Sequence, residues 1–214
     1  MADKLKIDIV SDVVCPWCTI GYKRLEKAIT ELGVQDQIEI EWQPFELNPN
    51  MPVEGQNVKE HITEKYGSTP EQQKESQQHM TEVGEELGFK FDYFDDMRMV
   101  NTFNAHILLD YAKDFGKQTE LKMRLTTAFF SERKDVSDKD ILKQALLDVG
   151  LNADEALARL DIEEIRYDIR NKQGYWKNMG VNSVPTIVFN RKSAVTGAQP
   201  VDTFKQVLTE LIKE

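Results

Sequence analysis

The hydrophobic pattern changes period twice within the first 45 residues, and this change restricts the fold more than any other feature. In KLKIDIV, apolar and polar residues alternate through Leu5, Ile7 and Ile9, which is typical of a strand. From Pro16 the apolar positions follow a helical spacing that ends at Gly33, and IEIEWQPF then alternates again. A strand, a helix and a strand in this order predict a βαβ unit with parallel strands and a right-handed crossover.

The rest of the pattern divides into a long helical part and a second mixed part. Between Val58 and Leu160 nearly every apolar spacing is helical, and Ser137 is expected to cap one helix, with Asp140 three residues on. After a further helix that ends near Gly180, TIVFN and AVTG predict two strands, and a final amphipathic helix follows. The sequence therefore predicts an α/β fold in which β-α-β and α-β-β-α units build a small mixed sheet around an all-helical insertion.

Composition excludes several classes of partner. The 214 residues are 40% hydrophobic and 30% charged, with a formal net charge of −10. This charge argues against nucleic acid and anionic membrane surfaces, which both require clustered Lys and Arg. No apolar run approaches the roughly 20 residues of a membrane span, and MADKLKIDIV has no apolar stretch typical of a signal peptide. A cytoplasmic location is expected.

The chain has two cysteines, Cys15 and Cys18, separated by Pro16 and Trp17. Random placement of two residues gives this spacing in about one per cent of cases. Cys15 follows the first strand at the expected N-cap of the first helix, with Pro16 at the favoured first position. Backbone N–H groups and the helix dipole stabilise a thiolate there. We therefore predict that Cys15 is an exposed nucleophile and that Cys18, one turn later and further inside, is the resolving thiol.

Two other interpretations of the pair are weaker. A structural zinc site requires four ligands, and His61, His79 and His106 are not closely paired with one another, so no metal is expected. An inert pair of buried cysteines is also conceivable, since buried cysteine is common. A Pro-Trp dipeptide at a strand-to-helix junction disfavours this interpretation, and the redox dithiol is preferred.

Several motifs together resemble a known family. CPWC after a first strand and SVPT before a late strand resemble the thioredoxin superfamily. The segments WQPFELNP, NTFNAH and GAQP are similar to cytosolic DsbA-like oxidoreductases of the FrnE type, and the resemblance extends over essentially the whole chain. It implies a thioredoxin-like domain in residues 1–56 and 161–214, with a helical insertion domain in residues 57–160. It also implies thiol–disulfide exchange at a CPWC dithiol.

The resemblance further implies which residues support the dithiol. Val184–Pro185 is expected to be a cis peptide bond that turns the Val184 backbone toward Cys15 for pairing with an extended substrate. Pro16 and Trp17 complete the active-site segment, and Trp17 offers an apolar surface to unfolded or hydrophobic substrates. The residues considered for substrate binding are Ser183, Asn101, His106 and Gln199. Three of these have a structural alternative: a packed histidine for His106, a helix cap for Asn101 and a turn residue for Gln199.

The implied function leaves alternatives open. The expected substrates are thiol- or disulfide-containing proteins or small thiols, with no cofactor beyond the dithiol and with glutathione as a candidate redox partner. The same fold is found in 2-hydroxychromene-2-carboxylate isomerases and kappa-class glutathione transferases, which typically have serine where Cys15 stands. A holdase-like binding protein is a third possibility. Oxidation, reduction and isomerisation are not distinguished by the sequence, because the relative stability of dithiol and disulfide decides among them.

Overall fold

The centre of the molecule is a four-stranded mixed sheet with the strand order β2-β1-β5-β6. The structure is a computed structural model that describes residues 4–213. Strand β1 (Leu5–Ser11) runs parallel to β2 (Ile38–Pro44), to which α1 (Pro16–Leu32) connects it. On its other side β1 pairs antiparallel with β5 (Thr186–Phe189), and β5 pairs antiparallel with β6 (Ser193–Thr196). The predicted βαβ unit and mixed sheet are confirmed.

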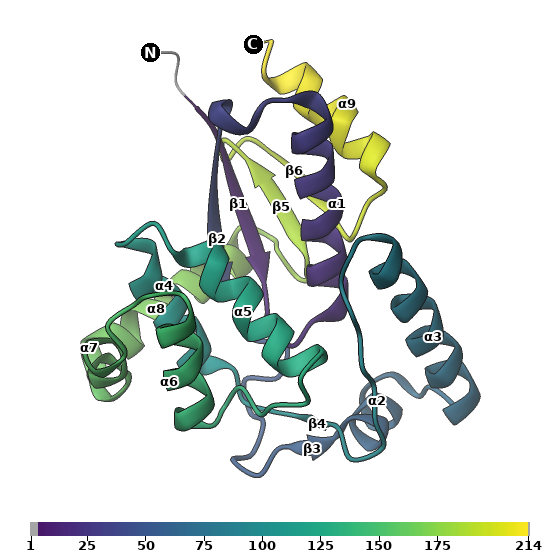
Figure 1. The fold of residues 1–214 in the computed structure, drawn as a ribbon, viewed down its shortest axis with the longest axis vertical. Helices are drawn as coiled ribbons and strands as arrows, with labels where there is room; N and C mark the ends of the chain where they lie inside the picture. The colour runs from purple at the N-terminus through teal and green to yellow at the C-terminus, as the bar shows by residue number, and fades with distance from the viewer. Residues whose placement is uncertain (1–3, 214) are drawn as a thin grey trace.

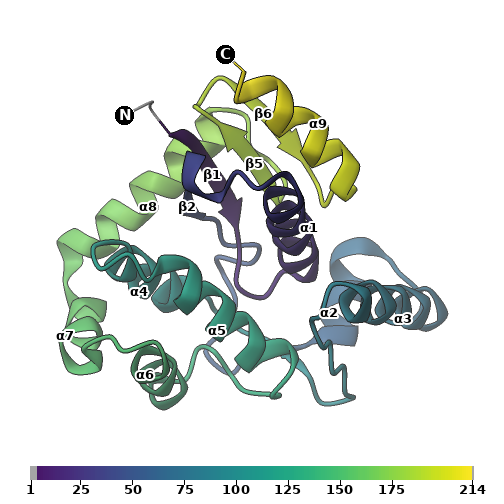
Figure 2. The same ribbon diagram turned by 45° about the horizontal axis from the view of Figure 1, so that its top comes forward.

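Helices cover both faces of this sheet. Figure 2 shows α1 and α9 (Val201–Leu211) on one side and α8 (Glu163–Asn178) on the other. One core cluster joins the inner face of the sheet to α1 and α9 through side chains such as Ile7, Leu25 and Phe204, all of them fully buried. The N-terminal end of α1, which carries the cysteines, is directed toward the remaining helices (Figure 1).

The segment between β2 and α8 is mainly helical, as predicted. Its helices are α2 (Val58–Tyr66), α3 (Pro70–Glu86), α4 (Phe103–Lys113), α5 (Gln118–Phe130), α6 (Lys139–Asp148) and α7 (Ala153–Ala158). Short 3₁₀ turns occupy Gln35–Gln37 and Arg159–Asp161, and two-residue strands β3 (Gln56–Asn57) and β4 (Arg98–Met99) form a separate pair. That pair was not predicted, because two residues are too few to show alternation. The proposed domain boundaries at residues 57 and 160 stay a prediction.

The expected cap of α6 is wrong by one residue. Asp138, not Ser137, is the N-cap, and its carboxylate accepts a hydrogen bond from the Asp140 N–H at 2.7 Å. Ser137 donates both its N–H and its hydroxyl to Asp135 instead. Asp and Ser are comparably good caps, so the neighbouring Asp135 carboxylate decides which of the two adjacent residues takes the position.

Helix α5 is fixed to the outer edge of the sheet through one side-chain amide. The Trp42 N–H donates to Gln118 Oε1 at 2.8 Å, and Gln118 Nε2 donates to the Trp42 carbonyl at 3.0 Å. The Trp42 indole N–H also donates to the Thr119 hydroxyl at 2.9 Å. These bonds join β2 to a helix 76 residues away.

Within residues 4–213, no helix is long and apolar enough to cross a bilayer.

Candidate functional site: the Cys15–Cys18 dithiol

Cys15 occupies the N-cap of α1, as predicted. Its backbone is extended (φ −99°, ψ 111°), and Pro16 is the first helical residue. The Cys18 N–H, one of the donors left free at a helix start, donates to Cys15 Sγ at 3.3 Å. Both cysteines are free thiols. A negative charge on Cys15 Sγ is therefore stabilised by a backbone donor and by the positive end of the helix dipole.

The two thiols are more buried than the sequence suggests. Cys15 is 5% exposed and Cys18 is 1% exposed. The order agrees with the prediction, but the description of Cys15 as exposed is wrong. The neighbouring Val14 is buried as well, in the core cluster of the helical block. Access to Cys15 is limited to a small part of its surface.

Trp17 is the open part of the motif. It is 37% exposed, and its ring centroid lies 6.1 Å from that of His79 on α3. Helix α3 therefore lies beside the CPWC segment. This arrangement agrees with the expected apolar surface at Trp17.

Burial sets the protonation of the inner thiol. It raises the pKa of Cys18 well above its ordinary value, and the hydrogen bond with Cys15 and the charge of Cys15 act in the same direction. The charge of Lys122 opposes them. Cys18 is accordingly a protonated thiol at neutral pH, and its attack on a neighbouring sulfur requires removal of that proton.

A buried contact between a histidine and an aspartate lies three residues before Cys15. His106 Nε2 is 3.2 Å from Asp12 Oδ1, and both side chains are nearly inaccessible. The Asp12 carboxylate also accepts the N–H groups of Val13 at 2.7 Å and Leu47 at 2.8 Å. Burial alone raises the pKa of Asp12, but the hydrogen bond and charge of His106, with the Leu47 N–H and Lys122, outweigh it and lower this pKa. Asp12 is an ionised carboxylate inside the protein.

Lys122, on α5, completes this buried group. It is 2% exposed, and its ammonium lies 5.1 Å from the centre of a Trp42 ring. Within the described residues its Nζ has no hydrogen-bond partner. Burial lowers the pKa of Lys122, and the charges of Cys18, Asp12 and Cys15 partly restore it. Lys122 is thus buried without a hydrogen bond to the described residues, and it lies close enough to Asp12 and the two thiols for their charges to affect its pKa.

The loop before β5 lies against the second turn of α1. Val184–Pro185 is cis, as expected, and a Cβ at Gly21 would approach Pro185 Cγ at 3.0 Å. The Pro185 carbonyl accepts the Gly197 N–H at 2.8 Å. Glycine at position 21 therefore lets this loop pack one turn beyond Cys18.

An apolar cavity of about 150 Å³ adjoins the dithiol segment. Val14 and Pro16 form its wall on the α1 side, and Met80, Met97 and Phe130 face them from the helical block. It is large enough for one aliphatic or aromatic side chain.

Among residues 4–213, no group of three or more His, Cys, Asp or Glu side chains is arranged to hold a metal ion.

The chain matches the family model of the DSBA-like thioredoxin domain over residues 6–209. It belongs to this family. A probable DsbA oxidoreductase from Streptomyces coelicolor is 30% identical, with a TM-score of 0.91 over 98% of this chain and 91% of that one. YwbO of Bacillus subtilis, described as uncharacterized, is 28% identical over 95% of this chain and 96% of its own length.

A more distant structure shares the fold. The cytosolic disulfide reductase DsbM from Pseudomonas aeruginosa, solved with GSH, is 15% identical with a TM-score of 0.67, over 98% of this chain and all of that one. The thioredoxin-like fold and the DsbA-like resemblance are thus confirmed. DsbA-like oxidoreductase chemistry is supported at the level of the family.

In this DSBA-like domain, the residues considered for substrate binding do not form one site. His106 is buried against Asp12. Asn101 lies one residue before Thr102, the N-cap of α4, and accepts the Phe103 N–H at 3.0 Å. Gln199 donates to the Thr196 carbonyl within its turn at 2.9 Å. Ser183 is exposed, and its carbonyl accepts the Thr186 hydroxyl at 2.8 Å. His106 and Gln199 thus make the contacts of their structural alternatives, a packed histidine and a turn residue, whereas Asn101 bonds to the first turn of α4 without being its N-cap.

Two charged residues of the DSBA-like site were missed by the sequence analysis. Asp12 had a signal, since it interrupts the apolar segment that leads into Cys15. Lys122 had none, because lysine in an amphipathic helix is ordinarily a surface residue.

Proposed function

We propose that the protein is a thiol–disulfide oxidoreductase in which Cys15 is the attacking thiol and Cys18 is the resolving thiol. The observation that carries this proposal is the hydrogen bond from the Cys18 N–H to Cys15 Sγ at the start of α1. It stabilises a thiolate on the outer cysteine, while burial keeps the inner one protonated. The two thiols thus differ in the way that sequential exchange requires.

The exchange reaction has two steps. The Cys15 thiolate attacks a substrate disulfide, so that a Cys15–substrate disulfide forms and the second substrate sulfur leaves as a thiolate that takes up a proton. Cys18 then loses its proton and attacks Cys15 Sγ, which forms the Cys15–Cys18 disulfide and releases the first substrate sulfur as a thiol. The substrate gains two electrons and the protein loses two; the reverse sequence oxidises a substrate dithiol.

The surroundings of Cys15 favour protein substrates. Trp17 is exposed beside the thiol, and the cavity lined by Val14 and Pro16 accepts an apolar side chain next to the reacting cysteine. A small thiol such as glutathione would recycle the pair. We place this activity in the cytoplasm. Thiols are kept reduced there, and a cysteine pair is more often reactive than part of a structural disulfide.

The test compares two single variants with the wild type. Cys18→Ser is expected to accumulate a stable mixed disulfide at Cys15 when mixed with glutathione disulfide, and mass spectrometry of the intact protein would detect it. Cys15→Ser is expected to form no adduct and to lose insulin reduction. A Cys15→Ser protein that reduces insulin disulfides at the wild-type rate would refute the mechanism.

A further inference from the structure

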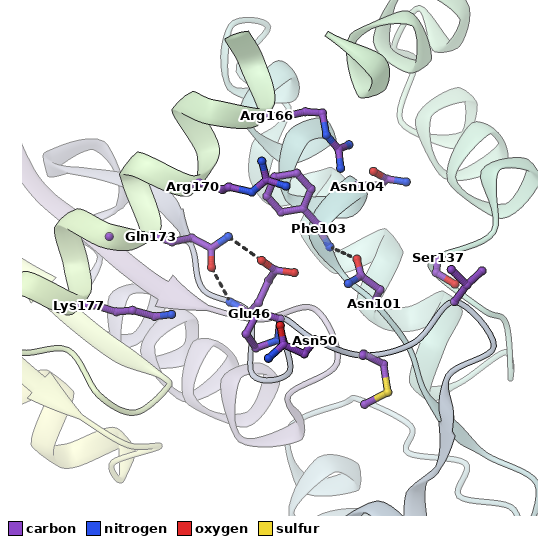
Figure 3. A pocket seen from close by; sticks show the side chains of 14 residues that line it. Glu46, Asn50, Asn101, Phe103, Asn104, Ser137, Arg166, Arg170, Gln173 and Lys177 are labelled. Atoms are coloured by element: carbon purple, nitrogen blue, oxygen red, sulfur yellow. Dashed lines mark hydrogen bonds between the residues drawn. The ribbon is translucent and has the colours of Figure 1, made fainter. Parts of the chain in front are cut away.

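A cavity of about 680 Å³ opens between α8, the start of α4 and the loop after β2. Figure 3 shows Arg166 and Arg170 reaching from α8 toward Phe103 and Asn104 on α4, with Lys177 further along α8. The chain as a whole carries a net charge of −10, yet three cations line this one cavity. Among the described residues of its lining, Glu46 is the single acidic side chain.

The two arginines are held together without an acidic partner. Their guanidinium carbons lie 4.8 Å and 4.9 Å from the centre of the Phe103 ring. Arg166 donates one N–H to the Leu160 carbonyl at 2.8 Å, but within residues 4–213 no carboxylate lies at ion-pair distance from either guanidinium. Like charges gathered at one ring repel each other. A bound anion would remove this repulsion.

Glu46 does not supply that anion. Gln173 Nε2 donates to its Oε2 at 2.9 Å, and Gln173 Oε1 accepts the Glu46 N–H at 3.2 Å. Burial raises the pKa of Glu46. The carboxyl group is therefore fixed in the wall by Gln173, and the arginine N–H donors remain directed toward the cavity.

A glycine in the middle of α8 is an independent observation. Gly174 lines the cavity, although glycine is among the least favourable residues in a helix interior. A Cβ at this position would meet no atom within 4 Å, so packing within the protein does not require glycine here. The space that a side chain would take is left open beside the two arginines, on the same face of the helix.

We propose that this cavity binds a small polyanion through carboxylate or phosphate oxygens held by Arg166 and Arg170, with Gly174 leaving room for the ligand. Guanidinium groups present their N–H donors in a planar fork that matches these oxygens. The positive end of the α4 dipole adds to the attraction, since the first turn of α4 has no acidic residue. This binding does not depend on the thiol chemistry proposed for Cys15.

The experiment is isothermal titration of the full chain with citrate and with pyrophosphate at low ionic strength. Arg170→Gln is expected to weaken binding about tenfold or more, the effect of losing a charge-assisted hydrogen bond. Arg159→Gln is the matched control, because Arg159 also stacks on an aromatic ring, Tyr111 at 4.5 Å, and lies outside the cavity. A preference for citrate or pyrophosphate would identify carboxylate or phosphate as the ligand group.

A second variant separates binding from folding. Gly174→Ala is expected to raise the thermal midpoint of the ligand-free protein, because alanine favours the helix, and to weaken binding of the same probe. Equal losses in Arg170→Gln and Arg159→Gln would show a general charge effect and overturn the proposal. If neither citrate nor pyrophosphate bound, or if Gly174→Ala kept the wild-type affinity, the proposal would be overturned as well.

Discussion

His106 Nε2 of helix α4 lies 3.2 Å from Asp12 Oδ1, on the segment that leads into Cys15. The two residues are 94 positions apart in the chain, and both side chains are at most 2% exposed. This contact joins helix α4 to the segment that leads into Cys15, and it is costly to break because the Asp12 carboxylate is buried. Several variants test what it and its neighbours do.

Replacing Asp12 with Asn is expected to destabilise the protein by about 3 kcal/mol at pH 7, because Lys122 loses a buried counter-charge and the buried hydrogen bonds of the carboxylate are weakened. The pKa of Asp12 is lowered by folding from its ordinary value of 3.8. Its contribution to stability is therefore complete above that value and is lost as pH falls through the lower, folded pKa. Urea denaturation should show a constant gap between wild type and variant from about pH 7 to 5, which narrows below 3.8. A gap that does not change with pH would contradict this assignment.

Replacing Lys122 with Met is expected to slow the reaction with little change in stability. The free energy of unfolding should change by less than about 1 kcal/mol, because the gain from removing a buried ammonium without a hydrogen bond is offset by the loss of its charge near the Asp12 carboxylate. Loss of the positive charge raises the pKa of Cys18 further. Release of a Cys15 mixed disulfide at neutral pH should then slow about tenfold, since attack requires the Cys18 thiolate.

Stopped-flow measurement of that release across pH would check the second effect, with the pH profile of the variant displaced upward. Lys117→Met is the control at the N-cap of the same helix, because Lys117 is a partly exposed lysine paired with Glu120. It is expected to change stability by less than about 1 kcal/mol. An unchanged pH profile in Lys122→Met would exclude an influence of this cation on Cys18.

Replacing Gly21 with Ala tests the packing of the cis-proline loop. Alanine normally stabilises a helix interior relative to glycine by about 1 kcal/mol. Here its Cβ would lie 3.0 Å from Pro185 Cγ and 3.4 Å from the Ala198 backbone, so we expect a net loss of about 1 kcal/mol and slower exchange with insulin. Chemical denaturation and an insulin assay measure the two effects. If Gly21→Ala were stabilising with full activity, the loop would not depend on close contact with α1.

Replacing Trp17 with Ala should separate protein substrates from small ones. Trp17 is 37% exposed and lies against His79, so the free energy of unfolding should change by less than about 1 kcal/mol. The value of kcat/KM for insulin is expected to fall, while that for glutathione disulfide is retained, because a small disulfide does not need the apolar surface. Equal losses for both substrates would instead place Trp17 in support of the thiol itself.

The sequence predicts those parts of the molecule that local pattern determines. Alternation in β1 and β2, the Pro16 helix start and the Gly33 stop are all local signals, and each agrees with the structure. The error at Ser137 is also local: two neighbouring residues are both good caps, and a third, Asp135, decides between them.

The sequence does not predict which charged or polar side chains become buried through contacts between distant segments. His106 and Lys122 have ordinary helical spacing, and their burial beside Asp12 depends on how the insertion packs. The same holds for Arg166 and Arg170. The sequence indicates only that they belong to the polar face of a helix, and the structure shows that both contact the Phe103 ring. Tertiary packing, rather than residue type, defines both groups.

The bonds between Gln118 and Trp42 have a consequence for the protein in concentrated solution. Strand β2 is an edge strand, and unpaired N–H and C=O groups on such an edge can recruit a strand from another molecule. The primary amide of Gln118 offers Trp42 the same donor and acceptor that a neighbouring peptide group would. At Trp42 this side chain occupies the place of a further strand, so a strand from another molecule cannot pair with β2 at that residue.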